Sequence, residues 1–506
     1  MTDGPSLRLL SIPASAADRL PNGTVRDAVS YFSPDAVVLP GERNARGYAT
    51  VRNLTEGIPT VHPQLGQNGE RVARYATGTS GLRRRSESAG GEPPAEAGGS
   101  GLLAVQNGAV LAELAGDDFG GERAVTYLFV PDLSVETDPT ALTAKLPHAD
   151  DIAALAGSVS GDLVVFAGCQ PAGYRHRWSL RDGERSLEVP VVGLGATGDG
   201  TPEFSEVVCT AAGTTATEPI PADKFGLRAL DGVGRATADR LVELGCEARD
   251  DVRDAAVSDL AELSGVGRTR AERLHAHADV IETGEPLVLT NETPIRTRAG
   301  RPPLCLDIET DGLSPTIVWQ IGVYDPATNT HRAFVERSDP TDASSVLGEF
   351  LEWLLGAHAD RTLITWNGDR FDYPQITRFL RRYHPHYVEA WEDMWTYDLY
   401  GWAVREGNTL LPGRTNRLDD VAAALGYEGA GTGLSGARTA AAYRRFMRAP
   451  DDPDAEPDWE RHVRYCRDDC EALWHVYESI ESAERRDVTD SGSGGAAGRQ
   501  SGLTEF

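Results

Sequence analysis

The sequence has 506 residues, of which 77 are acidic and 49 basic, giving a formal net charge of −28 at pH 7. This length exceeds one ordinary domain and predicts two to four. Because nucleic-acid-binding proteins are usually basic, the net charge by itself argues against that class.

The kind of basic residue qualifies this argument. Lysine occurs only at Lys145 and Lys224, so nearly every cation is an arginine. An acidic, lysine-poor chain is typical of proteins from salt-in halophiles. In molar salt the Debye length is about 3 Å, so net charge says little about partners and binding must rely on local geometry.

The cysteines predict neither a disulfide framework nor a metal site. The six are scattered and include no CxxC pair. Cys466 and Cys470 lie four apart on a predicted helix, and we interpret them as part of a buried helix face. The first residues lack the features of a signal peptide, and no apolar run reaches 18 residues. We therefore expect a cytoplasmic protein with no membrane partner.

Residues 1–218 predict one α/β or α+β domain of unknown function. Helices are expected over residues 16–31 and 149–156. Residues 76–100, rich in Gly, Ser, Arg and Glu, predict a disordered loop within the domain. No phosphate loop and no catalytic triad spacing is found there. Strands are predicted at residues 7–12, 36–41, 101–105, 109–112, 125–130, 162–167 and 187–192.

Residues 222–285 contain two similar units, each with Gly-Val-Gly between two amphipathic helix patterns. Glycines permit a tight turn, so that backbone N–H groups at the start of the second helix can meet a phosphate. The pair resembles the tandem helix-hairpin-helix family, which implies binding to the DNA backbone. A plain helical hairpin and a protein-interaction module remain alternatives. The candidate binding residues are Gly232, Gly234, Arg235, Gly265, Gly267, Arg268 and Arg270.

A linker is expected at residues 286–302, followed by a domain over 303–484 and a disordered tail at 485–506. Strands alternate with helices in this domain, which predicts a mixed sheet flanked by helices. Strands are expected near residues 304–310, 317–324, 331–335 and 362–366. Helices are expected at residues 345–356, 373–383, 416–426 and 459–482.

Two acids end the first strand of this domain. Asp307 and Glu309 are spaced i, i+2, so they project from one face of the strand, with Ile308 on the other. Two carboxylates packed together repel each other and are costly to desolvate. A bound divalent cation would make the pair tolerable, which predicts a metal-dependent phosphoester site.

Three motifs in order resemble the DEDDy branch of the DEDD 3′–5′ exonucleases, which have a ribonuclease-H-like fold. They are Asp307-x-Glu309, then Asn367-x-x-x-Phe371-Asp372, then Tyr465-x-x-x-Asp469. The resemblance implies that Asp307, Glu309, Asp372 and Asp469 hold two Mg²⁺ or Mn²⁺ ions.

In that family pattern Asp307 would bridge both ions, Glu309 and Asp469 would complete the site that activates water, and Asp372 would hold the other ion. Tyr465 would orient the water, while Asn367 and Phe371 would position substrate or pack.

Each motif alone has a plainer explanation as an ordinary strand or a solvated helix face, and their joint occurrence favours catalysis. The resulting hypothesis is a two-metal 3′–5′ exonuclease, with DNA favoured over RNA as substrate. The alternatives are a non-catalytic nucleic-acid-binding or scaffolding protein that keeps the fold, and an RNA-directed exonuclease. Surplus acids are expected in this composition, and on that ground five are left out of the site: Asp311, Asp369, Asp398, Asp419 and Asp420.

Overall fold

A computed structural model describes the chain in two compact units, Met1–Arg249 and Asp250–Phe506. Each unit is described by itself below. The tail beyond residue 486 and most of the predicted loop, residues 85–100, lie outside the described residues. Those described are 7–55, 57–62, 71–78, 81–84, 101–114, 125–138, 143–159, 161–195, 202–210, 213–216, 219–292 and 300–486.

The first unit is built on two sheets. One has the strand order β14-β13-β1-β2-β3, with β15 also pairing β13, and the other has the order β11-β12-β10-β7-β6-β4-β5. The strands of the first sheet are β1 (Leu7–Ser11), β2 (Ala36–Val38), β3 (Thr60–Val61), β13 (Glu203–Thr210), β14 (Gly213–Ala216) and β15 (Ile220–Pro221). Those of the second are β4 (Val72–Gly78), β5 (Gly81–Arg84), β6 (Gly101–Val105), β7 (Val125–Val130), β10 (Asp162–Ala167), β11 (Arg175–Asp182) and β12 (Arg185–Gly193). A separate two-stranded sheet pairs β8 (Glu136–Asp138) with β9 (Thr143–Lys145).

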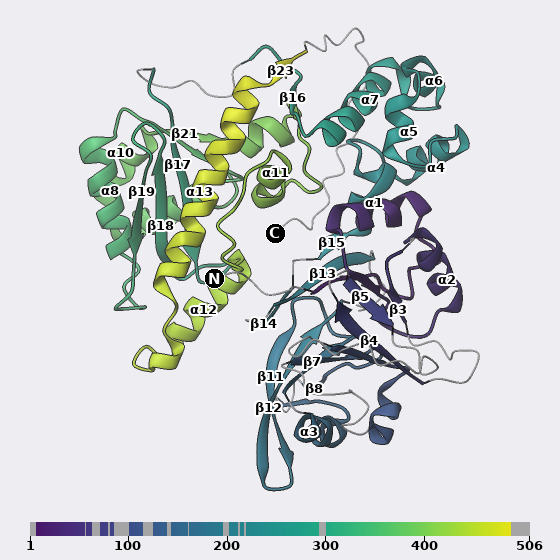
Figure 1. Cartoon of the computed structure of the whole chain (residues 1–506). Coiled ribbons are helices and arrows are strands. Elements are labelled where there is room, and N and C mark those ends of the chain that lie inside the picture. Colours follow the sequence, from purple (N-terminus) through teal and green to yellow (C-terminus); the bar gives the residue numbers. More distant parts are fainter. Residues whose placement is uncertain are drawn as a thin grey trace. The chain divides into compact units, whose positions relative to one another are not determined.

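Apolar side chains from both sheets form a shared core, which includes Leu9, Tyr127 and Phe166. A second core packs the outer face of the first sheet against α1 (Asn22–Phe32) and α2 (Ala45–Leu54). A third packs the second sheet against α3 (Ala149–Ser158) and the 3₁₀ helix η1 (Gly108–Glu113). The unit therefore has four layers of helices and sheets, in agreement with the predicted α/β or α+β class (Figure 1).

The helix expected over residues 16–31 begins only at Asn22, and two predictions for shorter segments before residue 200 are wrong. Residues 76–78 and 81–84, assigned to the loop, belong to the antiparallel strands β4 and β5. Residues 109–112, predicted as a strand, form the 3₁₀ helix η1. Both errors concern short segments, in which a few apolar or polar residues do not distinguish a strand from other structures.

The boundary between the units falls inside the region of the two glycine turns. In the first unit lie the 3₁₀ turns η3 (Ala222–Lys224) and η4 (Gly226–Ala229) and helix α4 (Arg235–Glu243). The predicted leading helix of the first hairpin is thus only a 3₁₀ turn. After α5 (Arg249–Asp254), the second hairpin lies in the second unit as α6 (Val257–Glu262) and α7 (Gly267–Thr283).

The second unit has a five-stranded mixed sheet of order β19-β18-β17-β20-β21. Strands β17, β18 and β19 are antiparallel neighbours, while β20 and β21 run parallel to β17. The strands are β17 (Leu304–Thr310), β18 (Val318–Asp325), β19 (Thr330–Val335), β20 (Thr362–Thr365) and β21 (Trp395–Asp398). The helices are α8 (Ser345–Ala357), α9 (Asp372–Tyr383), α10 (Val388–Glu392), α11 (Leu418–Ala424), α12 (Gly436–Arg448) and α13 (Trp459–Ser482).

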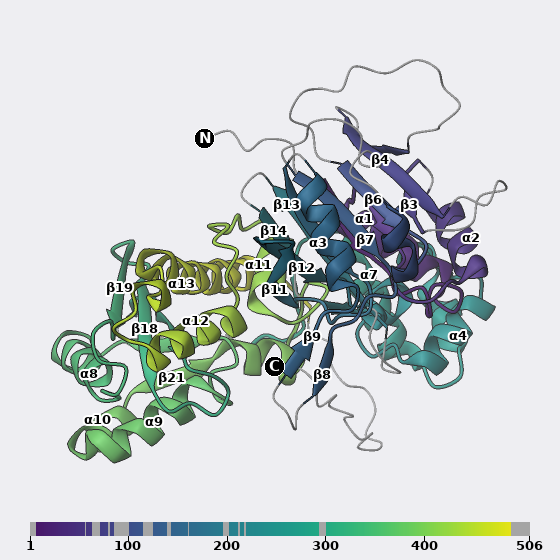
Figure 2. The same ribbon diagram turned by 90° about the horizontal axis from the view of Figure 1, so that it is seen from below.

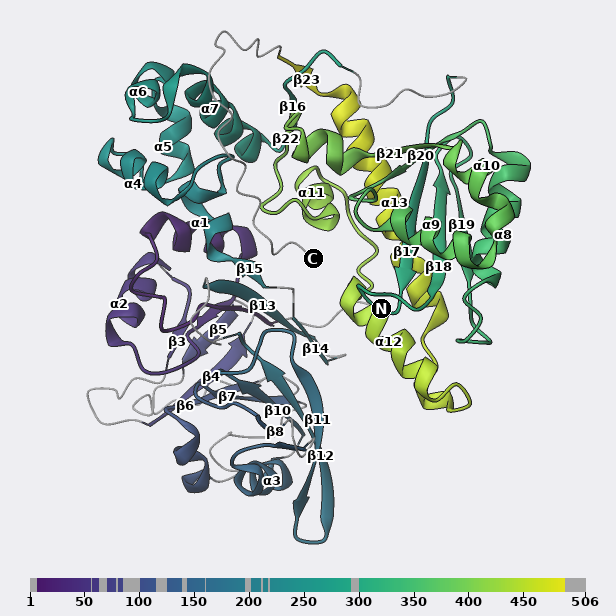
Figure 3. The same cartoon turned by 180° about the vertical axis from the view of Figure 1, so that it is seen from behind.

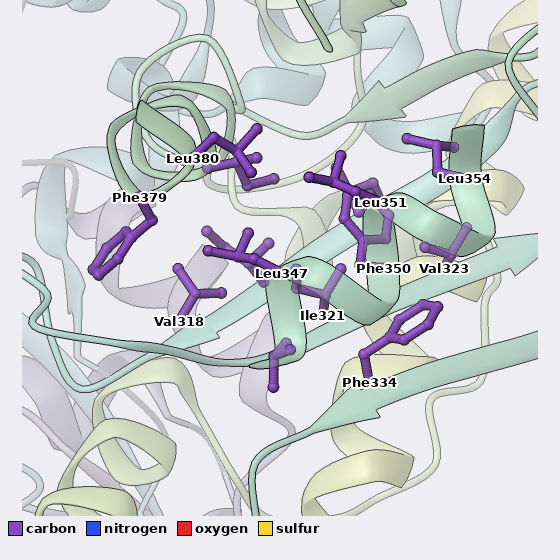
Figure 4. Close-up of a cluster of buried hydrophobic side chains, with 14 of the residues drawn as sticks. Val318, Ile321, Val323, Phe334, Leu347, Phe350, Leu351, Leu354, Phe379 and Leu380 are labelled. Carbon is purple, nitrogen blue, oxygen red and sulfur yellow. The ribbon is translucent and has the colours of Figure 1, made fainter. Parts of the chain in front are cut away.

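Helices cover both faces of this sheet. On one face, strand side chains such as Val318, Ile321 and Phe334 pack against α8 and α9, and Figure 4 shows this core. Figure 3 shows α8, α9 and α10 gathered at that side. The 24-residue helix α13 runs along the other face, seen from two directions in Figures 1 and 2. There Cys305 and Tyr324 pack against Cys470 and Leu473.

A small three-stranded sheet joins segments from upstream and downstream of the main sheet. Strand β16 (Leu287–Val288) pairs with β22 (Thr409–Leu410) and with β23 (Glu484–Arg485). The expected linker at 286–302 therefore begins with a strand. Helix α7 packs here as well, because Ala276 and Val280 are buried with Leu287 and Leu410. His277 Nε2 lies 3.2 Å from the carbonyl oxygen of Leu411.

Among the described residues, we find no helix that combines the length and the apolar character needed to cross a membrane.

Candidate metal centre

Strand β17 places two acids on the face that α13 covers. Leu304, Leu306 and Ile308 alternate into the core beneath α8 and α9, so Asp307 and Glu309 must point the other way. Asp307 is half-buried and Glu309 is buried. The register with β18 shifts directly after Glu309, where the chain leaves the regular ladder. The acids thus lie where the strand ends.

Helix α13 supplies the third acid. Asp458 caps this helix by accepting a hydrogen bond from the Arg461 N–H, which fixes where the helix begins. Carboxylate oxygens of Asp307, Glu309 and Asp469 all lie within 4.8 Å of one another. Tyr465, one turn before Asp469, donates its hydroxyl hydrogen bond to the Asp469 carboxylate. The motif spacing i, i+4 therefore brings both side chains to one place.

Asp372 reaches the same strand from α9, of which it is the first residue. Strand β20 pairs with β17 only at Leu304 and Cys305. Beyond that point this edge of β17 is open, and the Ile308 N–H donates a hydrogen bond to the Asp372 carboxylate. Asp372 is buried. It is not among the three acids that meet within 4.8 Å.

Burial raises the pKa of every acid in the group, and the charges of nearby carboxylates raise it further. Loss of solvent is the largest cause for all four, and the charges of Asp469 and Asp372 raise the pKa of Asp307 further. Asp307 and Asp469 act likewise on Glu309. The pKa of Asp372 and that of Asp469 are each raised to about 7. The group is therefore costly to ionise by itself.

This donor set fits a hard divalent cation. Several carboxylates meet here, and no arginine or lysine lowers the pKa of Asp307, Glu309 or Asp372. Carboxylate oxygens are the ligands that Mg²⁺ and Mn²⁺ prefer. A cation bound here would compensate the repulsion that raises the pKa values.

Asn367 has an unusual backbone beside the group. Its φ of 67° lies in the left-handed region, which a non-glycine residue rarely adopts. Its N–H donates to Asp398 Oδ1 at 2.8 Å, while its buried side-chain Oδ1 has no hydrogen-bond partner among the described residues. Phe371 packs partly buried against the core of α8 and α9, which favours packing for that residue.

Several acids left out of the site have structural partners instead. Asp311 Oδ1 accepts from the Thr316 N–H at 2.7 Å. Asp468 Oδ1 accepts from the Tyr427 hydroxyl and the Ala430 N–H, both at 2.9 Å. Asp398 pairs with Arg405. These contacts hold loops in place, and each of these carboxylates is already occupied by a hydrogen bond or an ion pair.

The structure adds neighbours that sequence reasoning missed. Cys466 Sγ lies 3.2 Å from Asp307 Oδ2. The side chain of Leu313 is 67% exposed, four residues after Glu309. Arg378 on α9 donates to the carbonyl oxygen of Pro315 at 2.5 Å, and Arg444 on α12 donates to that of Asp311 at 2.6 Å. The exposure of Leu313 cannot be read from the sequence, and the two arginines come from helices distant along the chain, so the sequence held no signal for them.

The hairpin residues occupy two glycine turns. Gly232 and Gly265 have φ values of 74° and 78°, which a residue with a side chain would adopt only under strain. Gly234 precedes α4 in an extended conformation with φ of −83°, and Arg235 begins that helix. Gly267 begins α7 with φ of 63°.

The two arginines of the second turn already have intramolecular partners. Arg268 pairs with Glu272 at 2.9 Å, with its own side chain 85% exposed. Arg270 donates to the carbonyl oxygen of Gly265 at 2.9 Å, so it braces its own turn.

Both the domain with the carboxylates and the region with the glycine turns match known families. Residues 304–481 match the RNase H superfamily, and residues 226–279 match the SAM-like helix-hairpin-helix tandem. The second unit therefore contains an RNase H superfamily domain, preceded by a helix-hairpin-helix tandem, as the sequence predicted. No curated protein matches this sequence.

Among solved structures, the family B DNA polymerase of the hyperthermophilic archaeon Pyrobaculum calidifontis has 14% identity and a TM-score of 0.28, covering 56% of this chain and 44% of the polymerase. Zinc-bound E. coli exonuclease I with single-stranded DNA has 17% identity and a TM-score of 0.21, covering 30% of this chain and 41% of the exonuclease. The E. coli exonuclease I complex with a dT13 oligonucleotide has 18% identity and a TM-score of 0.19, covering 29% of this chain and 41% of the exonuclease. This chain spans less than half the length of each.

Proposed function

We propose that the RNase H superfamily domain, residues 304–481, is a metal-dependent nuclease that removes nucleotides from the 3′ end of DNA. The observation that carries the proposal is the meeting of Asp307, Glu309 and Asp469 within 4.8 Å on one face of the sheet. The order and spacing of the three motifs support the 3′–5′ direction. The helix-hairpin-helix tandem supports a nucleic-acid substrate.

Each acid has a part in this proposal. Asp307 would hold both Mg²⁺ or Mn²⁺ ions, Glu309 and Asp469 would complete the position nearer the attacking water, and Asp372 would hold the other. Bound there, two ions would supply charge stabilisation to the attacking water and to the leaving 3′ oxygen. Strand β17 and helices α9 and α13 carry these carboxylates, and sites built on strands and helices are held more precisely than sites on loops.

Tyr465 would orient the water as a hydrogen-bonding group. Burial and the charge of Asp469 raise its pKa well above the usual value. Its hydroxyl therefore stays protonated at neutral pH, so Tyr465 cannot act as the base. Because that proton is donated to Asp469, the remaining role of the hydroxyl oxygen is to accept a hydrogen bond from the attacking water and hold it in line.

A basic helix beside the site supports a polyanionic substrate. Helix α12 contains four arginines and no acid, in a chain with a net charge of −28. Arg444 holds the loop that follows β17, and Arg445 and Arg448 are exposed. Arg378 holds the same loop from α9. Arg444 and Arg378 thus contact the loop that follows the acids of β17, where a phosphate backbone would need cations.

The decisive test is Asp307→Asn, assayed with Mg²⁺ on single strands labelled at the 3′ or the 5′ end. We expect kcat to fall at least about 100-fold, because even groups that only orient a metal ligand are worth about 10–100-fold. The matched control is Asp468→Asn, which changes the neighbouring acid on α13 and should keep activity. Wild-type activity in Asp307→Asn, or release of label from the 5′ end first, would reject the assignment.

The tandem would contribute affinity for the DNA backbone. Arg268→Ala removes an exposed cation at the second glycine turn. We expect weaker binding to DNA of any sequence. The slope of the logarithm of the binding constant against the logarithm of the salt concentration should be smaller in magnitude by about 1. Arg253→Ala on α5, whose guanidinium pairs with Asp254, serves as the control. An unchanged slope in Arg268→Ala would leave the hairpin a structural or protein-binding element.

A further inference from the structure

A second group of metal-binding side chains lies beside the carboxylates. The ligand atoms of His331 on β19 and of Cys466 and Cys470 on α13 all lie within 4.8 Å of one another. Both cysteines are fully buried, and His331 is half-buried. The cysteines are one helical turn apart, so their side chains share the face of α13 that meets the sheet.

A glycine keeps this space open. Gly322 lies on β18 directly opposite Asp307. A Cβ atom there would lie 2.5 Å from Cys466 Sγ, 3.0 Å from His331 Nε2 and 3.5 Å from Cys470 Sγ. Gly322 is not among the residues with positive φ, so the backbone does not require glycine. Glycine weakens a strand interior and often marks a close approach, which here is the approach of the three ligand atoms.

One ring nitrogen of His331 is available as a metal ligand. His331 Nε2 is buried without a hydrogen-bond partner among the described residues, and such a group is usually satisfied. It points into the space at Gly322, where the two sulfur atoms also lie. An unpaired imidazole nitrogen facing two thiols is an arrangement that a soft cation would complete.

We propose that His331, Cys466 and Cys470 bind one Zn²⁺ ion. One imidazole nitrogen and two thiolate sulfurs are donors that zinc takes readily, with a water as fourth ligand. The hard ions expected at the carboxylates prefer oxygen, so the two sites would select different metals. Binding would release the two thiol protons.

The charge of such a site suits its position. Two thiolates and Zn²⁺ sum to zero, so an occupied site adds no net charge next to Asp307, whose Oδ2 is 3.2 Å from Cys466 Sγ. The zinc would tie α13 to β19 and so fix the helix that carries Tyr465 and Asp469. This inference rests on sulfur and nitrogen donors and stands whether or not the carboxylates support a nuclease.

Cobalt provides a direct readout. The full chain is stripped with a chelator and refilled with Co²⁺, and absorption is recorded. Thiolate ligands produce a sulfur-to-cobalt charge-transfer band in the near ultraviolet, which a carboxylate site cannot produce. We expect this band to saturate at about one Co²⁺ per chain and to disappear when Zn²⁺ is added, since the site has one ligand set. A folded wild-type chain without the band would overturn the proposal.

Substitutions test which residues give rise to the charge-transfer band. The double variant Cys466→Ser/Cys470→Ser should lose it, whereas Cys305→Ala, which removes a buried thiol outside the group, should keep it. Asp372→Asn, which alters only the carboxylates, should also keep it. Circular dichroism checks that each variant is folded. Gly322→Ala retains all three ligands but fills their space, and we expect at least a tenfold weaker affinity for Co²⁺. A band that survives in the double variant would overturn the assignment.

Discussion

The four acids of the candidate metal centre oppose folding when no cation is bound. Each is removed from water, and each adds negative charge to its neighbours. Their folded-state pKa values lie above the value of about 4 for free carboxyl groups. Between pH 4 and 7 these four acids therefore bind more protons in the folded chain than in the unfolded one, and their contribution to stability falls as pH rises.

A pH titration of stability tests this reasoning. With chelator present, we expect the free energy of unfolding of the wild type, measured with urea, to fall relative to that of Asp372→Asn from pH 5 to pH 8. Asp372, whose pKa is about 7, accounts for ~3 kcal/mol of this difference, because about two pH units of the range lie below that pKa. Saturating Mn²⁺ should remove the difference. An equal pH dependence in the two proteins would contradict the raised pKa of Asp372.

The Tyr465 hydroxyl gives a second test at this scale. Tyr465→Phe removes the hydroxyl and keeps the ring. We expect kcat to fall about 10–100-fold, in the range of a group that hydrogen-bonds a metal ligand, with KM and Mn²⁺ affinity by calorimetry unchanged. Because the tyrosine stays protonated, the alkaline limb of the pH–rate profile should be the same in both proteins. A shift of that limb would point to Tyr465 acting as a base.

The sequence revealed some of these residues and hid others. Asp307 and Glu309 are predictable because a strand repeats every two residues, and Tyr465 and Asp469 because a helix repeats every 3.6. The partner of Cys466 and Cys470 was not predictable, since His331 lies on β19 and only the sheet register brings it near. Interpreting the cysteines as a buried helix face agreed with their burial but missed this neighbour.

At the scale of elements, long segments were predicted well. Residues 459–482 were expected as one helix, and α13 has these bounds. Helix α8 ends one residue beyond its prediction. The failures were short pieces such as η1, where the pattern is too brief to separate strand from 3₁₀ helix, and β16, whose two residues are a strand only because β22 and β23 lie beside them.

Helix α12 is the element whose role is most readily measured. Arg444→Ala removes a cation that also fixes the loop after β17. We expect KM for single-stranded DNA to rise about fivefold or more, with a weaker salt dependence, since each phosphate contact contributes to the slope. Arg301→Ala, at the opposite end of β17 and paired with Asp360, is the matched control. Equal effects of the two would show that only net charge matters.

At the scale of the molecule, family boundaries and structural boundaries differ. The family match begins at residue 304, but the second unit begins at Asp250. Leu287 and Val288 are buried against segments that belong to the family region. Sequence composition suggested a linker here, because two apolar residues in a polar stretch carry little weight.

Fragments of the second unit measure this difference. A fragment starting at residue 303 lacks α7 and β16 and leaves Leu410 uncovered. Burial of each large apolar side chain is worth ~1.5–3 kcal/mol, so we expect a loss of about 3 kcal/mol or more relative to a fragment starting at residue 250. This corresponds to a Tm lower by roughly 6–12 °C. Equal melting temperatures would show that β16 and α7 contribute nothing to the domain.

The placement of one glycine turn in each unit has an evolutionary consequence. Two copies of a repeat that pack in different surroundings are free to diverge under different constraints. Gly234 has an ordinary φ and open space around it, so mutation can replace it at little cost. Gly267, at the matching position, has φ of 63° and cannot be replaced without strain. Among relatives, we expect drift at position 234 and constancy at position 267.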